Sequence, residues 1–238
     1  MIATASINEL QKEFTEISGK HDMALHMAFC KKLVTSNDVE FLDYHYGLLR
    51  DRSVDDILYQ NLRRAFSKRG PAGEDYLHKK LVTETDASLQ GDVLQVLGGM
   101  KNHGGKRLDE TAEWARKLLQ SDVDTLRCRA LWVLGWLGTS DDIDNVVSDR
   151  LFHDPNNENR GWAATAMMQI FFSDNTTAEK SLGCLKQAIR AEKDYFALEM
   201  ILIAIQELTG KRFGLKSGSN ERAPREKVDT ALKKALTL

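Results

Sequence analysis

The chain of 238 residues contains only three prolines and three cysteines, and it has no apolar run long enough to cross a membrane. So few prolines permit long uninterrupted helices, because proline disrupts a helix interior. The cysteines Cys30, Cys128 and Cys184 are odd in number, far apart and without a CxxC pair, which favours small buried thiols in a reducing compartment. The first residues show no basic segment followed by an apolar one. We therefore expect a cytoplasmic protein with no membrane partner.

Recognisable catalytic motifs are also missing. The six histidines form no HExxH motif and no metal-ligand spacing with cysteine, and no GxSxG, P-loop or dinucleotide fingerprint occurs. The stretch NHGGKR at 102–107 has the glycines and cations of a phosphate loop, but no strand precedes it, so it is interpreted as a linker between helices. The sequence thus predicts no catalytic residue, no metal, no cofactor and no enzyme activity.

Positive charge is not in excess, since 33 Lys and Arg face 35 Asp and Glu. Residues 109–158 carry eleven acidic and five basic side chains, whereas residues 159–238 carry nine acidic and thirteen basic ones. Duplex DNA would be repelled by the acidic middle, because attraction to phosphates supplies most nonspecific affinity. Nucleic acid is therefore disfavoured as a partner. The alternative of a nucleic-acid-binding module is centred on the basic residues 159–238.

An apolar block recurs along the chain. The segment LWVLGWLG at 131–138 has relatives that begin at Leu94, Ala164 and Leu202, so the interval is 33 to 38 residues. The amphipathic segments 109–120, 141–151 and 177–189 lie between these blocks. Such a repeat predicts helix pairs in which the apolar helix is buried by its partner and by its neighbours. Leu134 and Leu137 are expected in this core.

The same pairing extends in both directions along one domain of residues 1–238. Gly70-Pro71 and Asp154-Pro155 are expected as turns and 216–224 as a polar loop. The further helices are expected over 7–18 as an N-terminal cap, 21–35 with 39–50, 54–67 with 74–83, and 195–208 with 225–236.

Residues 122–154 resemble a HEAT-type repeat. The residues that carry the resemblance are Asp122 before the helix, Arg127 in its first turn, Ala130, Leu134 and Leu137-Gly138. The resemblance is clearest over 86–214, where ELTGKRFG at 207–214 is similar to the tail of some bacterial arrays of this family. It implies an all-α fold, a right-handed α-solenoid of about six helix pairs, and a binding role without a particular activity.

A first candidate site is an acidic helix face. In 141–151 the apolar stripe is centred on Ile143 and Val147, and polar side chains lie opposite it at about 100° per residue. One interpretation is a docking surface for a basic protein. The other is an ordinary solvated face whose aspartates favour the helix N-terminus. The predicted partner-binding residues are Glu110, Glu113, Asp141, Asp142, Asn145 and Asp149.

A second candidate site is an aromatic column of Arg129, Trp132, Trp136 and Trp162, which helix alignment places opposite the apolar stripe. These side chains either pack between neighbouring repeats, with Arg129 over an indole, or form an exposed anchor for a partner.

Together these features predict a non-catalytic protein-binding module. A short array with an acidic groove is similar to immunity proteins that neutralise interbacterial toxins of the contact-dependent growth inhibition type. The similarity implies a basic toxin, such as a nuclease, bound by a monomer in a 1:1 complex. Two alternatives stay open: a HEAT-like DNA-repair glycosylase or nucleic-acid-binding module, and an assembly scaffold or lyase-like repeat protein.

Overall fold

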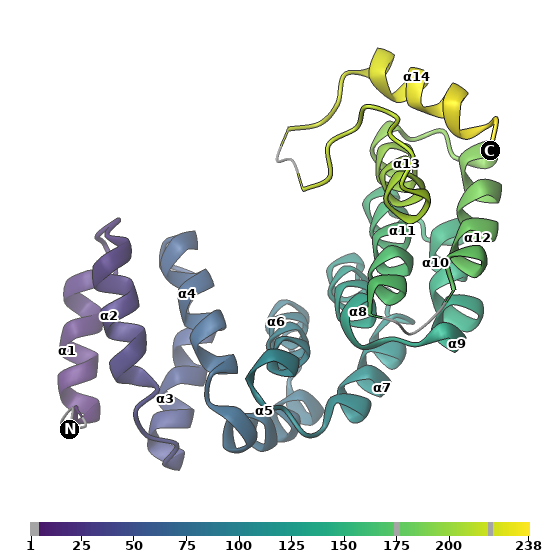
Figure 1. The fold of residues 1–238 in the computed structure, drawn as a ribbon. Helices are drawn as coiled ribbons and strands as arrows, with labels where there is room; N and C mark the ends of the chain where they lie inside the picture. Colours follow the sequence, from purple (N-terminus) through teal and green to yellow (C-terminus); the bar gives the residue numbers. More distant parts are fainter. Residues whose placement is uncertain (1–4, 174–176, 219–220) are drawn as a thin grey trace. The chain divides into compact units, whose positions relative to one another are not determined.

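The computed structural model describes residues 5–173, 177–218 and 221–238, and over these ranges the chain forms helices and loops without a strand (Figure 1). The all-α prediction is therefore confirmed. Contacts divide the chain into two compact units, residues 1–111 and 112–238, and the division falls inside helix α7, Leu108–Leu118. The single array predicted over 1–238 stays a prediction.

The first unit is built from alternating helices that pack on one another. Helix α2 contacts α4, and α4 contacts α6, while α1, α3 and α5 pack beside them. The helices expected over 7–18, 21–35, 39–50 and 54–67 are present. The bounds are α1 Ile7–Ile17, α2 Met23–Leu33, α3 Val39–Arg50, α4 Asp56–Ser67, α5 Gly70–Thr83 and α6 Ala87–Gly99, followed by a 3-10 turn, Met100–His103.

Side-chain caps explain where several of these helices begin. The carboxylates of Asp22, Asp55 and Asp86 accept hydrogen bonds from backbone N–H groups of the following first turn, at 2.7–2.9 Å. The expected turn at Gly70-Pro71 is wrong, because these residues begin α5. Proline fits the first helical turn, where its missing N–H has no intrahelical partner to lose.

The second unit repeats this arrangement. Helix α8 contacts α11 and α11 contacts α13, while α10, α12 and α14 pack beside them. After α7 the bounds are α8 Asp124–Leu137, α9 Ser140–Asp142, α10 Ser148–His153, α11 Asn157–Phe172, α12 Ala178–Ala191, α13 Tyr195–Thr209 and α14 Arg225–Ala235.

The apolar block 131–138 forms the end of α8 and faces α11. Leu131 and Leu134 are fully buried, whereas Leu137 is only partly buried. A Cβ atom on Gly135 would lie 3.2 Å from the Cα atom of Ala166 on α11. The two helix backbones approach each other closely here, and a residue without a Cβ atom permits this. The close approach therefore explains why the apolar block contains Gly135.

The helix expected over 141–151 is not regular. A π-helical turn, Ile143–Val147, separates α9 from α10. Ile143, Val147 and Leu151 are buried as predicted. A π turn holds more residues than an α turn, so the side chains beside it change direction.

The loops before α6, α11 and α13 share a buried carboxylate two residues before the helix-capping residue. Glu84, Asp154 and Glu192 each accept hydrogen bonds from the backbone N–H groups that follow. Each also binds an arginine of an earlier helix, namely Arg50 at 2.6 Å, Arg127 at 2.7 Å and Arg160 at 2.7 Å. These ion pairs fix the start of each helix in its unit.

His45 occupies a fully buried position in the first unit. Its Nε2 atom lies 3.0 Å from the carbonyl oxygen of Leu62, and its Nδ1 atom accepts a hydrogen bond from Arg69 Nε at 3.1 Å. Both contacts suit a neutral ring with the proton on Nε2. Burial, and then the charge of Arg69, hold the pKa of His45 well below its ordinary value.

This geometry predicts acid-sensitive stability. Below about pH 6.5 the unfolded chain binds a proton at His45 that the folded chain does not, so the free energy of unfolding should fall by up to ~1.4 kcal/mol per pH unit. Urea unfolding at about pH 7.5, 6.5 and 5.5 measures this slope. In His45→Gln the amide keeps both hydrogen bonds, and the slope should shrink to what His78 contributes, whose pKa is also lowered by burial and by Arg107. Equal slopes in both proteins would contradict the assignment.

Candidate functional sites

The acidic residues of α9 and α10 do not all reach the surface. Asp141 is exposed and forms no ion pair with any described residue, and Asn145 is exposed as well. Asp149 pairs with its neighbour Arg150 and keeps about half of its side chain exposed. These three residues lie on the surface as predicted.

Asp142 is different, and its expected exposure is wrong. It is 3% exposed and binds Arg116 of α7 through both oxygens, at 2.5 and 3.0 Å. It also accepts the backbone N–H of Thr139 at 2.8 Å, so it caps its own short helix. Burial raises the pKa of Asp142, but the hydrogen bonds from Arg116 and Thr139 outweigh burial and hold it below its ordinary value. Asp142 therefore stabilises the fold and cannot meet a partner.

Helix α7 places the two glutamates in different units. Glu110 belongs to the first unit, where Arg107 of the same turn binds it through two hydrogen bonds of 2.8 and 2.7 Å. Glu113 belongs to the second unit, is exposed, and has no ion-pair partner in the part of the chain that the structure describes. Glu113 is thus the freer of the two carboxylates.

Sequence reasoning missed Asp144, which is exposed on the π turn and lies 2.6 Å from Lys180 of α12. The helix-period rule gave it no special place, because the π turn was not foreseen. Within the second unit, the end of α7, the π turn and the two short helices beside it therefore present four accessible carboxylates. Two of them, Glu113 and Asp141, have no basic neighbour within ion-pair distance among the described residues, and the other two are Asp144 and Asp149.

Three members of the aromatic column come together between α8 and α11. The guanidinium carbon of Arg129 lies 4.4 Å from the ring centre of Trp132, and the rings of Trp132 and Trp162 meet edge to face at 5.1 Å. Trp136 lies further along α8 and is partly buried. All four side chains are partly exposed, so the contacts show the packing of Arg129 over an indole without removing the column from the surface.

The glycine-rich linker at 102–107 holds a carboxylate of its own chain. Backbone N–H groups of Lys106 and Arg107 donate to Glu74, each at 2.8 Å, and Glu74 is 1% exposed. The amides that a phosphate would use are therefore occupied, which agrees with the linker interpretation.

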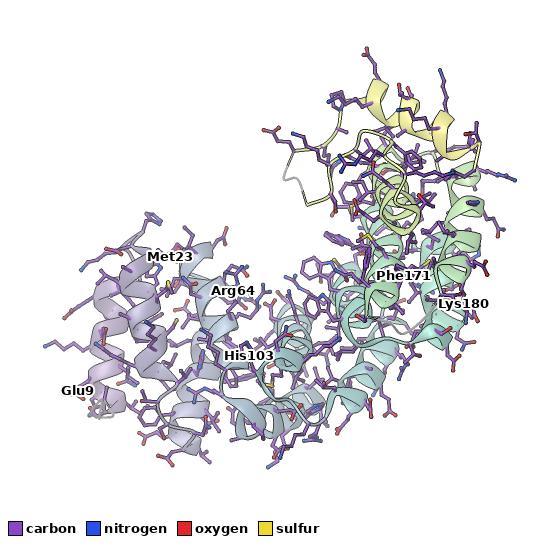
Figure 2. All side chains as sticks on the ribbon, in the orientation of Figure 1. Glu9, Met23, Arg64, His103, Phe171 and Lys180 are labelled. Atoms are coloured by element: carbon purple, nitrogen blue, oxygen red, sulfur yellow. The ribbon has the colours of Figure 1, made fainter. Side chains whose placement is uncertain are left out.

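A groove between α2 and α4 in the first unit was not foreseen from the sequence. Its volume is about 420 Å³. Met23 and Met27 of α2 line it and are 50% and 49% exposed, and Cys30 and Ala65 form more of its apolar surface. Figure 2 labels Met23 on α2 and Arg64 on α4. The available signal was the composition of α2, which is apolar on the side away from its core residues as well.

Other site chemistry is limited in the described residues. They contain no group of three or more His, Cys, Asp or Glu side chains placed to hold a metal ion, and none of their helices is long and apolar enough to span a bilayer. Burial raises the pKa of Cys30 and of Cys128 to about 11, so both thiols are neutral near pH 7.

No protein-family model and no curated protein matches the chain.

Proposed function

We propose that this chain is a non-catalytic protein-binding module, and that the accessible carboxylates of its second unit bind a basic partner. One observation carries the proposal. The acidic groups that stabilise the fold, such as Asp142 and Asp154, are buried against arginines, whereas Glu113 and Asp141 are exposed and take no part in those pairs. Exposed charge that folding does not require is available to attract and orient a partner.

The proposed architecture is a right-handed HEAT-type array of about six helix pairs. Its support is the repeated stacking of α2, α4 and α6 in one unit and of α8, α11 and α13 in the other, with further helices packed beside α2, α4, α6, α11 and α13. Helical arrays of this kind offer long surfaces with fixed spacing, which suits protein recognition better than chemistry.

The partner class that fits best is a basic toxin, with this chain as its immunity protein in the cytoplasm and a 1:1 complex as the product. Acidic side chains on a rigid helix surface can meet the cationic surface with which a nuclease binds phosphates. The π turn adds support, because such turns are frequent at functional sites and here Asp144 and Asn145 lie on it.

The test is charge reversal at Asp141 and Asp149. Asp141→Lys with Asp149→Lys should leave the fold nearly intact, since exposed substitutions usually change stability by less than ~0.5 kcal/mol. The double variant should associate with a basic toxin domain about tenfold or more slowly at low salt, because steering by exposed charge acts on the encounter rate. Surface plasmon resonance at about 50 and 300 mM NaCl measures the rate and its salt dependence.

The matched control is Glu16→Lys with Glu40→Lys, which makes the same change in net charge at exposed sites of the first unit. It should bind as the wild type does. The toxin to use is a basic toxin domain encoded beside the gene, and growth during co-expression reports protection. Wild-type protection by the double variant would remove the acidic surface from the proposal. Base excision from alkylated DNA that is lost in Trp162→Ala would instead favour the glycosylase alternative.

A further inference from the structure

We propose that the groove between α2 and α4 is a second docking site, and that it takes an acidic amphipathic helix of a partner protein. The proposal is independent of the acidic surface in the second unit. It rests on the combination of an exposed apolar floor with a rim of uncompensated positive charge.

The floor is unusual for an exposed surface. Met23 and Met27 are one helical turn apart and half exposed, although methionine side chains are normally buried. The amide of Asn61 donates to the sulfur of Met23 at 3.2 Å, which holds this side chain at the groove. Cys30 adds a neutral thiol, because burial raises its pKa to about 11. Flexible methionines suit a surface that must adapt to the side chains of another helix.

The rim is basic. Lys31, Arg64 and Lys68 line the groove and are exposed, and none of them forms an ion pair with a described residue. Other arginines of this unit are paired, for example Arg50 with Glu84 and Arg63 with Asp92. The lining includes no carboxylate among the residues that the structure describes. The charge that complements this rim is therefore negative and has to come from the partner.

The shape favours a helix as the occupant. Two packed helices enclose the groove, and the 11 residues of α2 give it a length of about 16 Å. About three turns of a partner helix fit this length, with an apolar stripe against the methionines and acidic residues beside Lys31, Arg64 and Lys68. A flat bilayer cannot fill a groove, and a small acyl ligand would need deeper enclosure than half-exposed methionines provide.

Peptide binding to the full chain tests the proposal. The probe is a fluorescein-labelled helical peptide of about 14 residues with leucines spaced three and four apart and glutamates on both flanks. Its twin has lysine at each glutamate position. In fluorescence anisotropy the acidic peptide should bind at least tenfold more tightly than its twin, and the methyl resonances of Met23 and Met27 should shift on its addition.

Variants locate the contact. Met23→Ser with Met27→Ser should weaken acidic-peptide binding at least tenfold, and Arg64→Glu with Lys68→Glu should reverse the preference between the two peptides. The control, Lys79→Glu with Val82→Ser, makes similar changes on the exposed side of α5 and should change nothing. Circular dichroism and urea unfolding confirm that each variant is folded.

Three results would overturn the proposal: no saturable binding of the acidic peptide, equal binding of both peptides, or binding that the groove variants leave unchanged. Vesicles with about a quarter anionic lipid serve as a further probe. If they bind the protein through Met23 and Met27 while the peptide does not, the groove is a lipid contact and the helix assignment is wrong.

Discussion

Replacing Arg127 with methionine is expected to lower the free energy of unfolding by about 3–5 kcal/mol. Arg127 and Asp154 have side chains only 3% and 0% exposed, and two hydrogen bonds of 2.7 and 2.9 Å join them. Methionine fills much of the same volume but removes the cation that forms both of these hydrogen bonds with the buried Asp154 carboxylate. Arg150, whose Nη1 atom lies 3.9 Å from the carboxylate, remains as a more distant cation. The cost is the desolvation of a buried charge that has lost its closest cation, rather than the loss of one attraction.

Arg127→Met also removes contacts that Arg127 makes with the loop before α8. Arg127 donates to the carbonyl oxygen of Ser121 at 2.9 Å and pairs with Asp124, so it joins the loop before α8 to the loop before α11. Urea unfolding of Arg127→Met measures the change. Arg190→Met is the control, because Arg190 is exposed on α12, and it should stay within about 0.5 kcal/mol of the wild type. A loss at Arg127 as small as the loss at Arg190 would mean that the pair contributes nothing.

Helix positions were the part of the fold that the sequence allowed to be predicted. Apolar residues at helical spacing mark the buried faces of α7 and α12, and the recurring apolar blocks mark α8, α11 and α13. These signals are local and repeat, so one good match supports the next. An equally regular pattern is formed by Glu84, Asp154 and Glu192, each of which lies two residues before a helix-capping residue. The sequence does not show what these carboxylates do, because the arginines that bind them lie on earlier helices.

The acidic face was harder to predict because a helical projection assumes 100° per residue. The π turn at Ile143–Val147 breaks this assumption, and it comes directly after Asp142. In addition, the projection cannot show that Arg116 of another helix reaches Asp142. Burial of a charged side chain depends on a partner far away in the sequence, and such pairs are not visible in the periodicity of one helix.

The groove was missed for a related reason. The sequence predicted one helix over 21–35 without separating its apolar faces, and in the structure Phe29 and Leu33 are buried while Met23 and Met27 are not. Two apolar stripes on one short helix cannot both face a single core. The sequence shows that such a helix has more apolar surface than one neighbour covers, but only the structure shows which stripe is left exposed.

Leu134→Ala is the second substitution with a large expected effect, about 2–5 kcal/mol of unfolding free energy. Leu134 is fully buried on α8, where α11 packs closely beside Gly135, so the backbone cannot easily move inward to fill a cavity. Leu137 is one turn away on the same helix and only partly buried, so Leu137→Ala removes the same atoms from a site that water can reach. Its loss of unfolding free energy should be clearly smaller, and the difference between the two alanine variants reports the cost of the enclosed cavity at Leu134. Urea unfolding of both proteins at one pH gives the comparison. Equal losses, or a loss at Leu134 below about half a kcal/mol, would show that the apolar block of α8 is not the rigid contact between α8 and α11.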